Sequence, residues 1–428
     1  MAVSKNKLLN SLLPRIGFGW FLYLLIWPFG ALITSLQQFR RPVAKTVFWL
    51  FCVYFGFSFV VPKDIAGSAD SARYATQLIE MHSKTVSFEN LVFALYNPAL
   101  GFVDIYQPLS TWIVSIFTDD PKWLFALFGA VFGFFYAQNI WLLLKRVNIK
   151  VGFVLFLFML GFALTNPIWN INGVRMWTAA QVFMYGVLLY FLEEKKVRGI
   201  IWISISILFH FSFLFPVSLF FAFIFIPDYL LVYFIFYLLT TLVKEINLIA
   251  VRDSLSFLPE VFQPRVDIYT NQDYAVSLKE SASQLAWHVR FAQIAGRIVI
   301  YSWVISAFIT QRYWQPYTQK IYKRLFAFAL FIAGFANIAS LVPSGGRFLT
   351  IANGLFYAVF VLILIQPALA SKVRYVKTLT VPLLLFSLIF SIRVGFDYMS
   401  FFTIIGNPLL VLTGIEQTPL IEFVKDLF

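Results

Sequence analysis

The sequence predicts an all-α, polytopic integral membrane protein with roughly 10–12 transmembrane helices and two large external loops. The 428 residues are 60% hydrophobic and only 12% charged, so the chain has too few polar residues to cover a soluble globule of that size. Its apolar residues come in runs of about 20, the length that crosses a hydrocarbon core of about 30 Å. Basic residues gather in short loops between these runs, which is the positive-inside pattern. We expect a single transmembrane domain over residues 1–428.

Composition also excludes several functional classes. The net charge of +13 lies in loops rather than in one patch, so nucleic acid is not an expected partner. Cys52 is the single cysteine, which excludes a disulfide framework or a cysteine metal site. His82, His210 and His288 lie far apart in the sequence and form no metal-binding motif. We expect neither a metal nor a cofactor.

The first two apolar runs cover residues 17–36 and 46–61, and a basic loop at 40–45 separates them. If this loop is cytoplasmic, the N-terminus is external in spite of its own basic residues, unless the first run turns back at Pro28. The sequence leaves both arrangements open. No small-residue cleavage site follows the first run, so we expect it to stay as an anchor rather than to act as a signal peptide.

Residues 62–122 form a long segment that we place outside the membrane. The segment contains four Lys or Arg and seven Asp or Glu residues, and this excess of acidic residues suits the non-cytoplasmic side. Residues 68–82 predict a helix with Ser68 or Asp70 as its N-cap. The stretch 101–117 is apolar but contains polar residues and a proline, so we expect a helix that lies along the membrane surface.

The next apolar runs predict alternating spans at 123–144, 151–165 and 174–192. This order places residues 166–175 at the outer boundary of the membrane. The following apolar stretch, 199–243, is interrupted by Pro216 and Pro227. It predicts either two spans or one span with a re-entrant segment.

Residues 244–290 form the second large loop. Five Lys or Arg and six Asp or Glu leave it near neutral, which again favours the outside. Tyr269 and Tyr274 in this loop have the character of interfacial aromatic residues. The loops near 311–324 and 372–377 are basic, so we expect them on the cytoplasmic side. The remaining apolar runs predict spans at 291–309, about 325–342, 348–366 and 378–392.

A few ionisable residues inside apolar sequence are the candidates for function. An arginine in hydrocarbon costs between about 2.5 and over 10 kcal/mol, so it is kept only where it faces protein, water or an anion. Arg175 is the first candidate catalytic residue for this reason, and His210 and Asp70 are the others. The candidate substrate-binding residues are Arg73, Tyr74, Asn172, Arg347 and Arg297.

Gathered at one face of a membrane, these residues fit a lipid-linked diphosphate. The guanidinium fork matches phosphate oxygens in bidentate geometry. When a sugar C1 is displaced from diphosphate, negative charge grows on the leaving group, and fixed cations stabilise that transition state. A carboxylate or a neutral histidine within hydrogen-bond reach can take the proton of the acceptor hydroxyl.

Each candidate also has a purely structural explanation. Arg175 can extend its charge to the membrane interface, and His210 can be satisfied by a neighbouring hydroxyl or carbonyl. Arg347 can anchor a tight turn. Asp70 can cap a helix with Arg73 as its i,i+3 partner. The functional interpretation depends on the meeting of several such residues at one face.

The residues also carry a resemblance to a known family. The chain resembles the EpsG family of exopolysaccharide polymerases, relatives of the Wzy-type O-antigen polymerases, from about residue 55 to 356. The likeness rests on FGFSFVVPKDIAGSADSARYATQLIE, FVDIYQPLSTWIVSIFTDDPKWLFALFGAVFGFFY, INGVRMWTAAQ, LFHFSF and GGRFL. The family's N-G-x-R-Q motif appears here with Met176 in place of Gln.

This resemblance implies a GT-C-like, metal-independent glycosyltransferase in the bacterial inner membrane, with its active face periplasmic or external. Such an enzyme moves a growing glycan from undecaprenyl diphosphate to a lipid-linked repeat unit, producing exopolysaccharide, capsule or O-antigen. By the same resemblance Arg175 and Arg347 would hold diphosphate, and Asp70, Arg73 and Tyr74 would shape the acceptor side. His210 would be a base or a structural partner. Whether a chain-length regulator binds stays open.

Two other functions stay open at this point. An O-antigen ligase would use similar arginines and a histidine in its large external loop, and His288 at the edge of the 244–290 loop suits it. A lipid-linked oligosaccharide flippase or transporter also hides arginines in a cavity, but such proteins commonly show internal repeats. The sequence has no repeat of fixed period.

Overall fold

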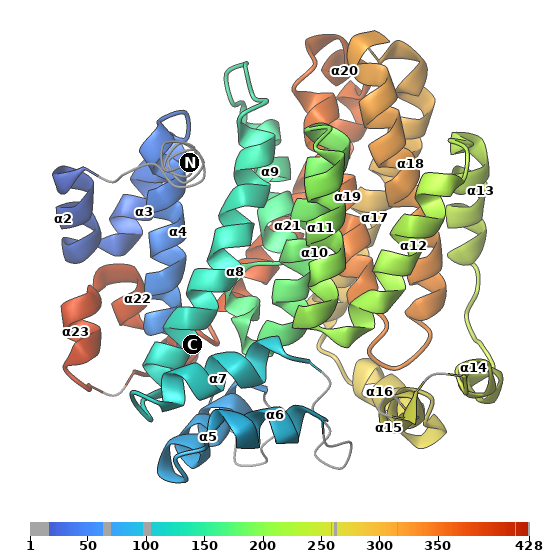
Figure 1. Cartoon of the computed structure of the whole chain (residues 1–428). Coiled ribbons are helices and arrows are strands. Elements are labelled where there is room, and N and C mark those ends of the chain that lie inside the picture. The colour runs from blue at the N-terminus through green and yellow to red at the C-terminus, as the bar shows by residue number, and fades with distance from the viewer. Residues whose placement is uncertain are drawn as a thin grey trace.

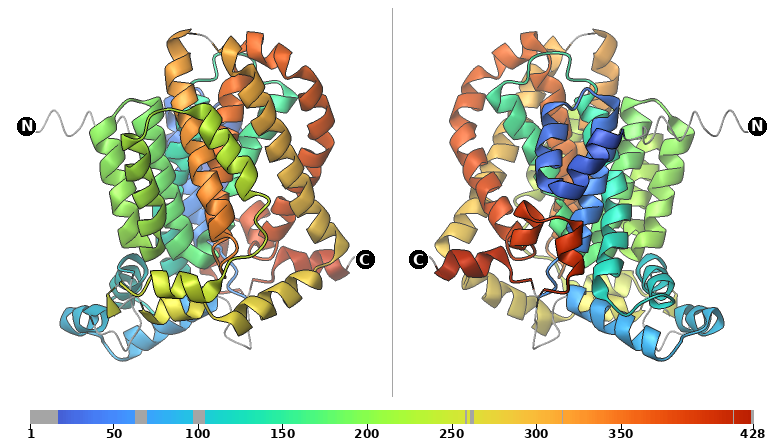
Figure 2. Two further views of the ribbon diagram at one scale, coloured as in Figure 1. Left: turned by 90° about the vertical axis from the view of Figure 1, so that its right-hand side faces the viewer. Right: turned by 90° about the vertical axis from the view of Figure 1, so that its left-hand side faces the viewer.

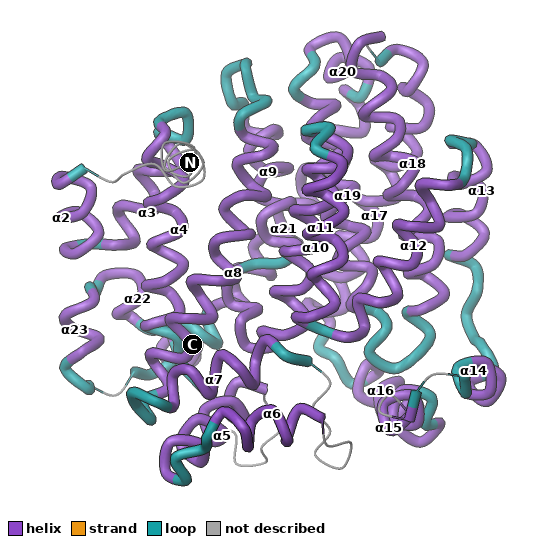
Figure 3. Tube along the Cα trace, in the orientation of Figure 1, coloured by secondary structure: helices purple, strands orange, loops and turns teal. Residues whose placement is uncertain are grey.

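The computed structural model describes residues 17–62, 70–96, 104–257, 259–260, 263–314, 316–415 and 417–426. Within these ranges the chain forms helices, turns and loops, and no strand (Figure 3). The prediction of an all-α fold is therefore confirmed for the described part of the chain.

Six helical segments are long and apolar enough to cross a membrane, which identifies a helical membrane protein. One of them, residues 153–192, is too long for one crossing and bends at Asn166-Pro167 into two helices joined by the short turn η2 (Ile168–Gly173). Most of the resulting helices lie close to the predicted spans: α8 (Pro121–Leu144), α9 (Phe153–Thr165), α10 (Val174–Leu192), α17 (Trp287–Thr310), α19 (Arg347–Leu364) and α21 (Arg374–Gly395). Helix α18 (Pro316–Ala339) differs, because it begins inside the stretch 311–324 that the sequence predicts as a basic loop.

The apolar stretch 199–243 differs from both sequence predictions, because it forms three helices. They are α11 (Lys196–Phe209), α12 (Leu214–Phe225) and α13 (Leu230–Thr240). The chain breaks at Pro227, as predicted, but its other break falls at His210 and not at Pro216. Pro216 is the third residue of α12, in the first turn, where no intrahelical N–H bond is lost.

The bundle has two distinct ends (Figure 1). One, which we call the capped end, is covered by helices that lie across it: α5 (Asp70–Ser83), α6 (Phe88–Tyr96), α7 (Tyr106–Ser115), α14 (Leu248–Ser254), α15 (Gln263–Tyr269) and α16 (Gln272–Ser283). The other, the basic end, holds the Lys- and Arg-rich loops and α20 (Pro367–Lys372). There Lys145 and Arg146 both pair with Glu193 at 2.7 Å. The two predicted external segments thus lie at the same end.

The first apolar run turns back on itself. Helices α2 (Phe18–Ile26) and α3 (Pro28–Gln37) lie side by side against α4 (Pro42–Phe57) and join at Trp27 (Figures 1 and 2). Phe18 and Gln37 are therefore at the same end, as in the re-entrant alternative. The tip is held by the Trp27 indole, which donates a hydrogen bond to the Ile404 carbonyl at 2.8 Å.

A second short hairpin provides that carbonyl. It consists of α22 (Phe401–Ile405) and α23 (Pro408–Leu412) and precedes α24 (Leu420–Asp426) at the capped end (Figure 1).

Asp70 is the first helical residue of α5 rather than its N-cap, and the alternative cap, Ser68, lies outside the described residues.

Helices α4 and α8 approach each other more closely than side chains normally allow. A Cβ at Gly129 would collide with the carbonyl oxygen of Cys52, and one at Gly56 with the carbonyl oxygen of Phe125. Small residues permit such backbone contact between helices in membranes. Helix α8 also contacts α10 and η2, which carry residues of the candidate site.

Candidate functional site

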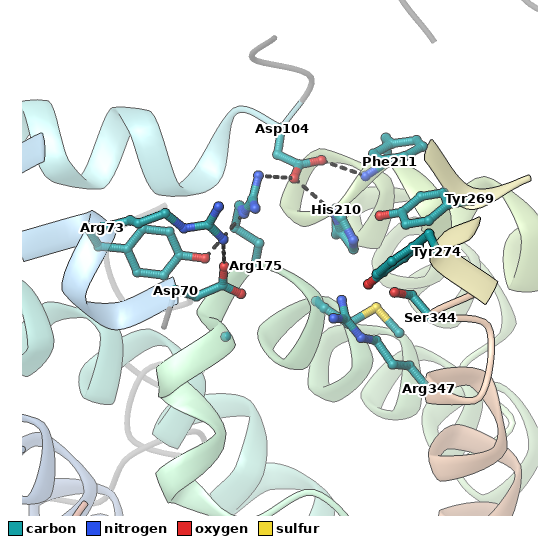
Figure 4. Close-up of a pocket in the computed structure, with 13 residues that line it drawn as sticks. Asp70, Arg73, Asp104, Arg175, His210, Phe211, Tyr269, Tyr274, Ser344 and Arg347 are labelled. Atoms are coloured by element: carbon teal, nitrogen blue, oxygen red, sulfur yellow. Dashed lines mark hydrogen bonds and ion pairs between the residues drawn. The ribbon is translucent and has the colours of Figure 1, made fainter. Parts of the chain in front are cut away.

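A polar cavity of about 210 Å³ opens at the capped end, where the sequence candidates meet. Helices from distant parts of the chain surround it (Figure 4). Its lining residues are Asp70, Arg73, Tyr74, Asp104, Gly173, Arg175, Met176, His210, Phe211, Tyr269, Tyr274, Ser344 and Arg347. Arg175 and Arg347 therefore face one common cavity at one end of the bundle.

Asp104 is the centre of the hydrogen-bond network in this cavity. Its Oδ2 accepts hydrogen bonds from His210 Nδ1 at 2.8 Å and from Arg175 Nη1 at 3.2 Å. Its Oδ1 accepts the backbone N–H of Phe211 at 2.7 Å. With 2% of its surface exposed, Asp104 is almost completely buried. One carboxylate thus fixes the break between α11 and α12 and joins it to the first turn of α10.

The charge state of Asp104 follows from these contacts. Burial alone raises the pKa of this carboxyl, but the hydrogen bond and charge of His210, followed by the charge of Arg175, hold its pKa below the ordinary value. The group is therefore ionised at neutral pH and can only accept hydrogen bonds. Because an ionised carboxylate only accepts, Nδ1 of His210 is the donor in this hydrogen bond.

Among the described residues that line the cavity, every charged side chain except that of Arg347 has a hydrogen-bond or ion-pair partner. Asp70 forms an ion pair with Arg73, whose side chain is 59% exposed at the edge of the cavity. Arg175 Nε also donates to the Tyr74 hydroxyl at 3.3 Å. Burial raises the pKa of Tyr74 to about 12, so this phenol stays protonated.

Arg347 has no ion-pair or hydrogen-bond partner for its side chain within the described residues. Figure 4 shows it reaching into the cavity from the side opposite Arg73 and Arg175. Of the described residues that line this cavity, two are carboxylates and three are arginines, so one positive charge has no counter-ion among them. Arg347 is also the first residue of α19, where the helix dipole adds positive potential.

A tight turn sets the position of Arg347. Ser344 adopts a positive φ of 63°, and a Cβ at Gly345 would collide with the carbonyl oxygen of Ala339. The backbone therefore folds directly onto the end of α18 before α19 begins. Only glycine fits at 345 without moving this turn.

An apolar cavity of about 500 Å³ adjoins the polar one. The two share Met176, His210, Phe211, Tyr269, Ser344 and Arg347. The remaining lining comes from α12, α14, α15 and the 339–348 turn, with residues such as Leu214, Phe215, Val251, Leu255 and Val266. A guanidinium group thus lies at the boundary between a polar and an apolar compartment.

The structure brings together most of the residues singled out from the sequence. Asn172 lines a second polar cavity beside the first. Arg297 lines none of these cavities, because it lies exposed on the outer face of α17. His288 is likewise exposed and outside them.

Sequence reasoning missed Asp104 and undervalued two tyrosines. Asp104 was counted only as one acid of an external segment, although a carboxylate inside apolar sequence is a signal of the same kind as Arg175. Tyr269 and Tyr274, expected as interfacial aromatics, line the polar cavity. Within the described residues, no group of three or more His, Cys, Asp and Glu side chains could hold a metal ion.

No protein-family model matches this chain, and no curated protein or solved structure matches it significantly.

Proposed function

We propose that this protein is a membrane glycosyltransferase that polymerises undecaprenyl-diphosphate-linked oligosaccharide repeat units into exopolysaccharide, capsule or O-antigen. The observation that supports it best is the position of Arg347. An arginine without a counter-ion lies where a polar cavity meets an apolar one. A ligand that suits both compartments has an anionic head and a hydrocarbon chain.

A lipid diphosphate has this chemistry. Its phosphate oxygens would accept hydrogen bonds from the Arg347 side chain, because a guanidinium favours anions. The polyprenyl chain would lie in the apolar cavity, away from water. Arg175 lines the same cavity but is already bonded to Asp104 and Tyr74, so its main role would be to hold Asp104 in place.

His210 is our candidate general base. Asp104 accepts the Nδ1 proton, which leaves Nε2 to take a proton from the acceptor hydroxyl. The acceptor oxygen would form a bond to C1 of the donor glycan as the bond from C1 to the phosphate oxygen breaks. Undecaprenyl diphosphate would leave with both bonding electrons, and its added negative charge would be stabilised by Arg347.

The same proposal assigns the protein to the bacterial inner membrane with a GT-C-like topology. The crossings would be formed by α4, α8 to α13, α17 to α19 and α21. The basic end would be cytoplasmic by the positive-inside rule. The capped end, which holds the cavities, would be periplasmic or external.

The test is to delete the protein in a polysaccharide-producing host and to size the product. Loss of a polymerase leaves single repeats on the lipid carrier or on the surface. Long chains that are not attached to lipid A core would instead indicate a ligase, and repeats trapped inside the cell a flippase. Either of these two results would contradict the proposal.

A further inference from the structure

A second polar cavity, also of about 210 Å³, lies behind the wall formed by Asp70, Gly173, Met176 and Arg347. These residues line both polar cavities, so the two compartments are neighbours. The remaining lining residues are Trp169, Asn170, Asn172, Trp177, Val394 and Tyr398. They come from η2, the first turns of α10, and the end of α21 with the turn after it.

Two aromatic rings in this cavity pack closely against their neighbours. Trp169 is 7% exposed and packs against Gly395. Tyr398 stacks on Phe59 with ring centroids 5.4 Å apart and an angle of 15° between the planes. Fixed aromatic surface offers contact area with little conformational entropy to lose on binding.

The polar groups here are less well satisfied than in the first cavity. The side-chain oxygen of Asn172 is buried and has no hydrogen-bond partner. Among the described residues, the indole N–H groups of Trp169 and Trp177 also lack a partner. A buried polar group without a partner costs about 1–3 kcal/mol, so a ligand that supplied the missing bonds would be stabilised.

We propose that this second cavity is a sugar subsite that binds one ring of the acceptor glycan. A pyranose has apolar C–H faces that suit tryptophan and tyrosine, and hydroxyls that both donate and accept. The Asn172 oxygen would accept from one hydroxyl, while an indole N–H would donate to another.

This inference rests on the proposed function for the role of the ring as acceptor. The donor diphosphate would occupy the first cavity beside Arg347. Of the two polar cavities, His210 lines only the first, so the reacting hydroxyl of the acceptor would lie there, and the second cavity would hold a further ring of the same glycan.

The test uses the full chain in detergent, labelled with fluorotryptophan, and methyl glycosides of glucose, galactose and N-acetylglucosamine as probes. Trp169→Phe and Trp177→Phe variants assign the two resonances in fluorine NMR spectra. We expect at least one glycoside to shift both resonances in a saturable manner, and to leave that of the exposed Trp123 unchanged. Asn172→Ala should weaken this binding by about tenfold, because one hydrogen bond is lost.

Trp123→Phe is the matched control, and it should bind the glycosides as the wild type does. Thermal unfolding of each variant shows that it is folded. Absence of a shift with every glycoside, or an affinity that Asn172→Ala leaves unchanged, would overturn the sugar subsite. Failure of the proposed function looks different: glycosides would still bind, but deletion of the protein would leave polysaccharide length unaltered.

Discussion

Among the described residues, Arg347 differs from the other arginines that line the polar cavity because no carboxylate pairs with it. Arg73 pairs with Asp70, and Arg175 with Asp104. The positive charge of a paired guanidinium is partly neutralised by its partner, whereas an unpaired guanidinium attracts an anionic ligand from solution.

Replacement of Arg347 by Ala should lower the rate of chain extension by about 10²–10³-fold, because one fixed cation beside the leaving group is removed. Arg347→Lys should restore activity only in part, since an ammonium cannot form the bidentate contact. The measurement is polymer length and rate from purified protein in vesicles with lipid-linked repeats. Arg297→Ala is the comparison, and an equal loss there would return Arg297 to the site.

The role of His210 can be separated from its hydrogen bond to Asp104. An amide at this position can still donate to the carboxylate but cannot take a proton. We expect His210→Gln and His210→Asn each to slow extension by about 10²–10⁴-fold, with undecaprenyl diphosphate binding retained. His288→Gln should be active as the wild type. Unchanged extension in both His210 variants would exclude the base.

The buried, ionised carboxylate of Asp104 should make the stability of the protein depend on pH. Its folded pKa lies below the ordinary value, so its contribution is complete above about pH 4 and is lost as the pH falls through the folded pKa. Asp104→Asn should cost about 1–3 kcal/mol in unfolding free energy, because Arg175 and His210 lose an ionised partner. Thermal unfolding of the wild type and of Asp104→Asn from about pH 3 to pH 8 measures the difference in unfolding free energy.

The difference in unfolding free energy between wild type and Asp104→Asn should shrink as the pH falls below about pH 4, because the wild-type carboxyl then becomes protonated. Asp119→Asn, at an exposed acid outside the cavities, should have little effect at any pH. A difference that instead grew below about pH 4 would contradict the charge state that we assign to Asp104.

At the scale of helices, close backbone contact decides which helices are neighbours. The contact of Gly129 with Cys52 allows α4 and α8 to lie together, and no side chain fits between them. Gly129→Ala should therefore destabilise the protein by about 1–3 kcal/mol, because a backbone carbonyl cannot move aside as a flexible side chain can.

The measurement for Gly129→Ala is the thermal unfolding temperature of the detergent-solubilised protein. Gly152→Ala adds the same methyl group where nothing lies within 4 Å, so it should change that temperature little. Equal effects of the two substitutions would show that the α4 and α8 contact contributes no stability.

Helix boundaries show what a one-dimensional pattern can predict. The spans at 123–144, 174–192 and 348–366 lie within two residues of α8, α10 and α19, because uninterrupted apolar runs end at polar loops. The break at His210 has no such local signal. Its extended backbone is held by Asp104, which lies over a hundred residues away in the sequence.

At the scale of the whole molecule, charge distribution gives the two ends different surroundings. The basic loops lie at one end, and the helices that surround the cavities at the other (Figure 1). Cys52 is the only cysteine and is buried, so single introduced cysteines can report which end faces which side. The topology is testable in this way without other changes to the chain.

We expect a membrane-impermeant maleimide to label Ser283→Cys in intact cells and to leave Ser371→Cys unlabelled until the cells are opened. Ser283 ends α16 at the capped end, and Ser371 lies in α20 at the basic end. The wild type, which has only buried Cys52, is the control and should stay unlabelled. Labelling in the reverse order would place the cavities on the cytoplasmic side.

The length of apolar runs and the cost of charge in lipid are local properties, so they predict a helical membrane protein and single out Arg175, His210 and Arg347 before any coordinates are known. The turn of the first apolar run at Trp27, the link that Asp104 makes between Arg175 and His210, and the lack of a counter-ion for Arg347 among the described residues are visible only in the folded chain. These features depend on contacts between residues far apart in the sequence, and periodicity and composition carry no information about which distant side chain completes a pair.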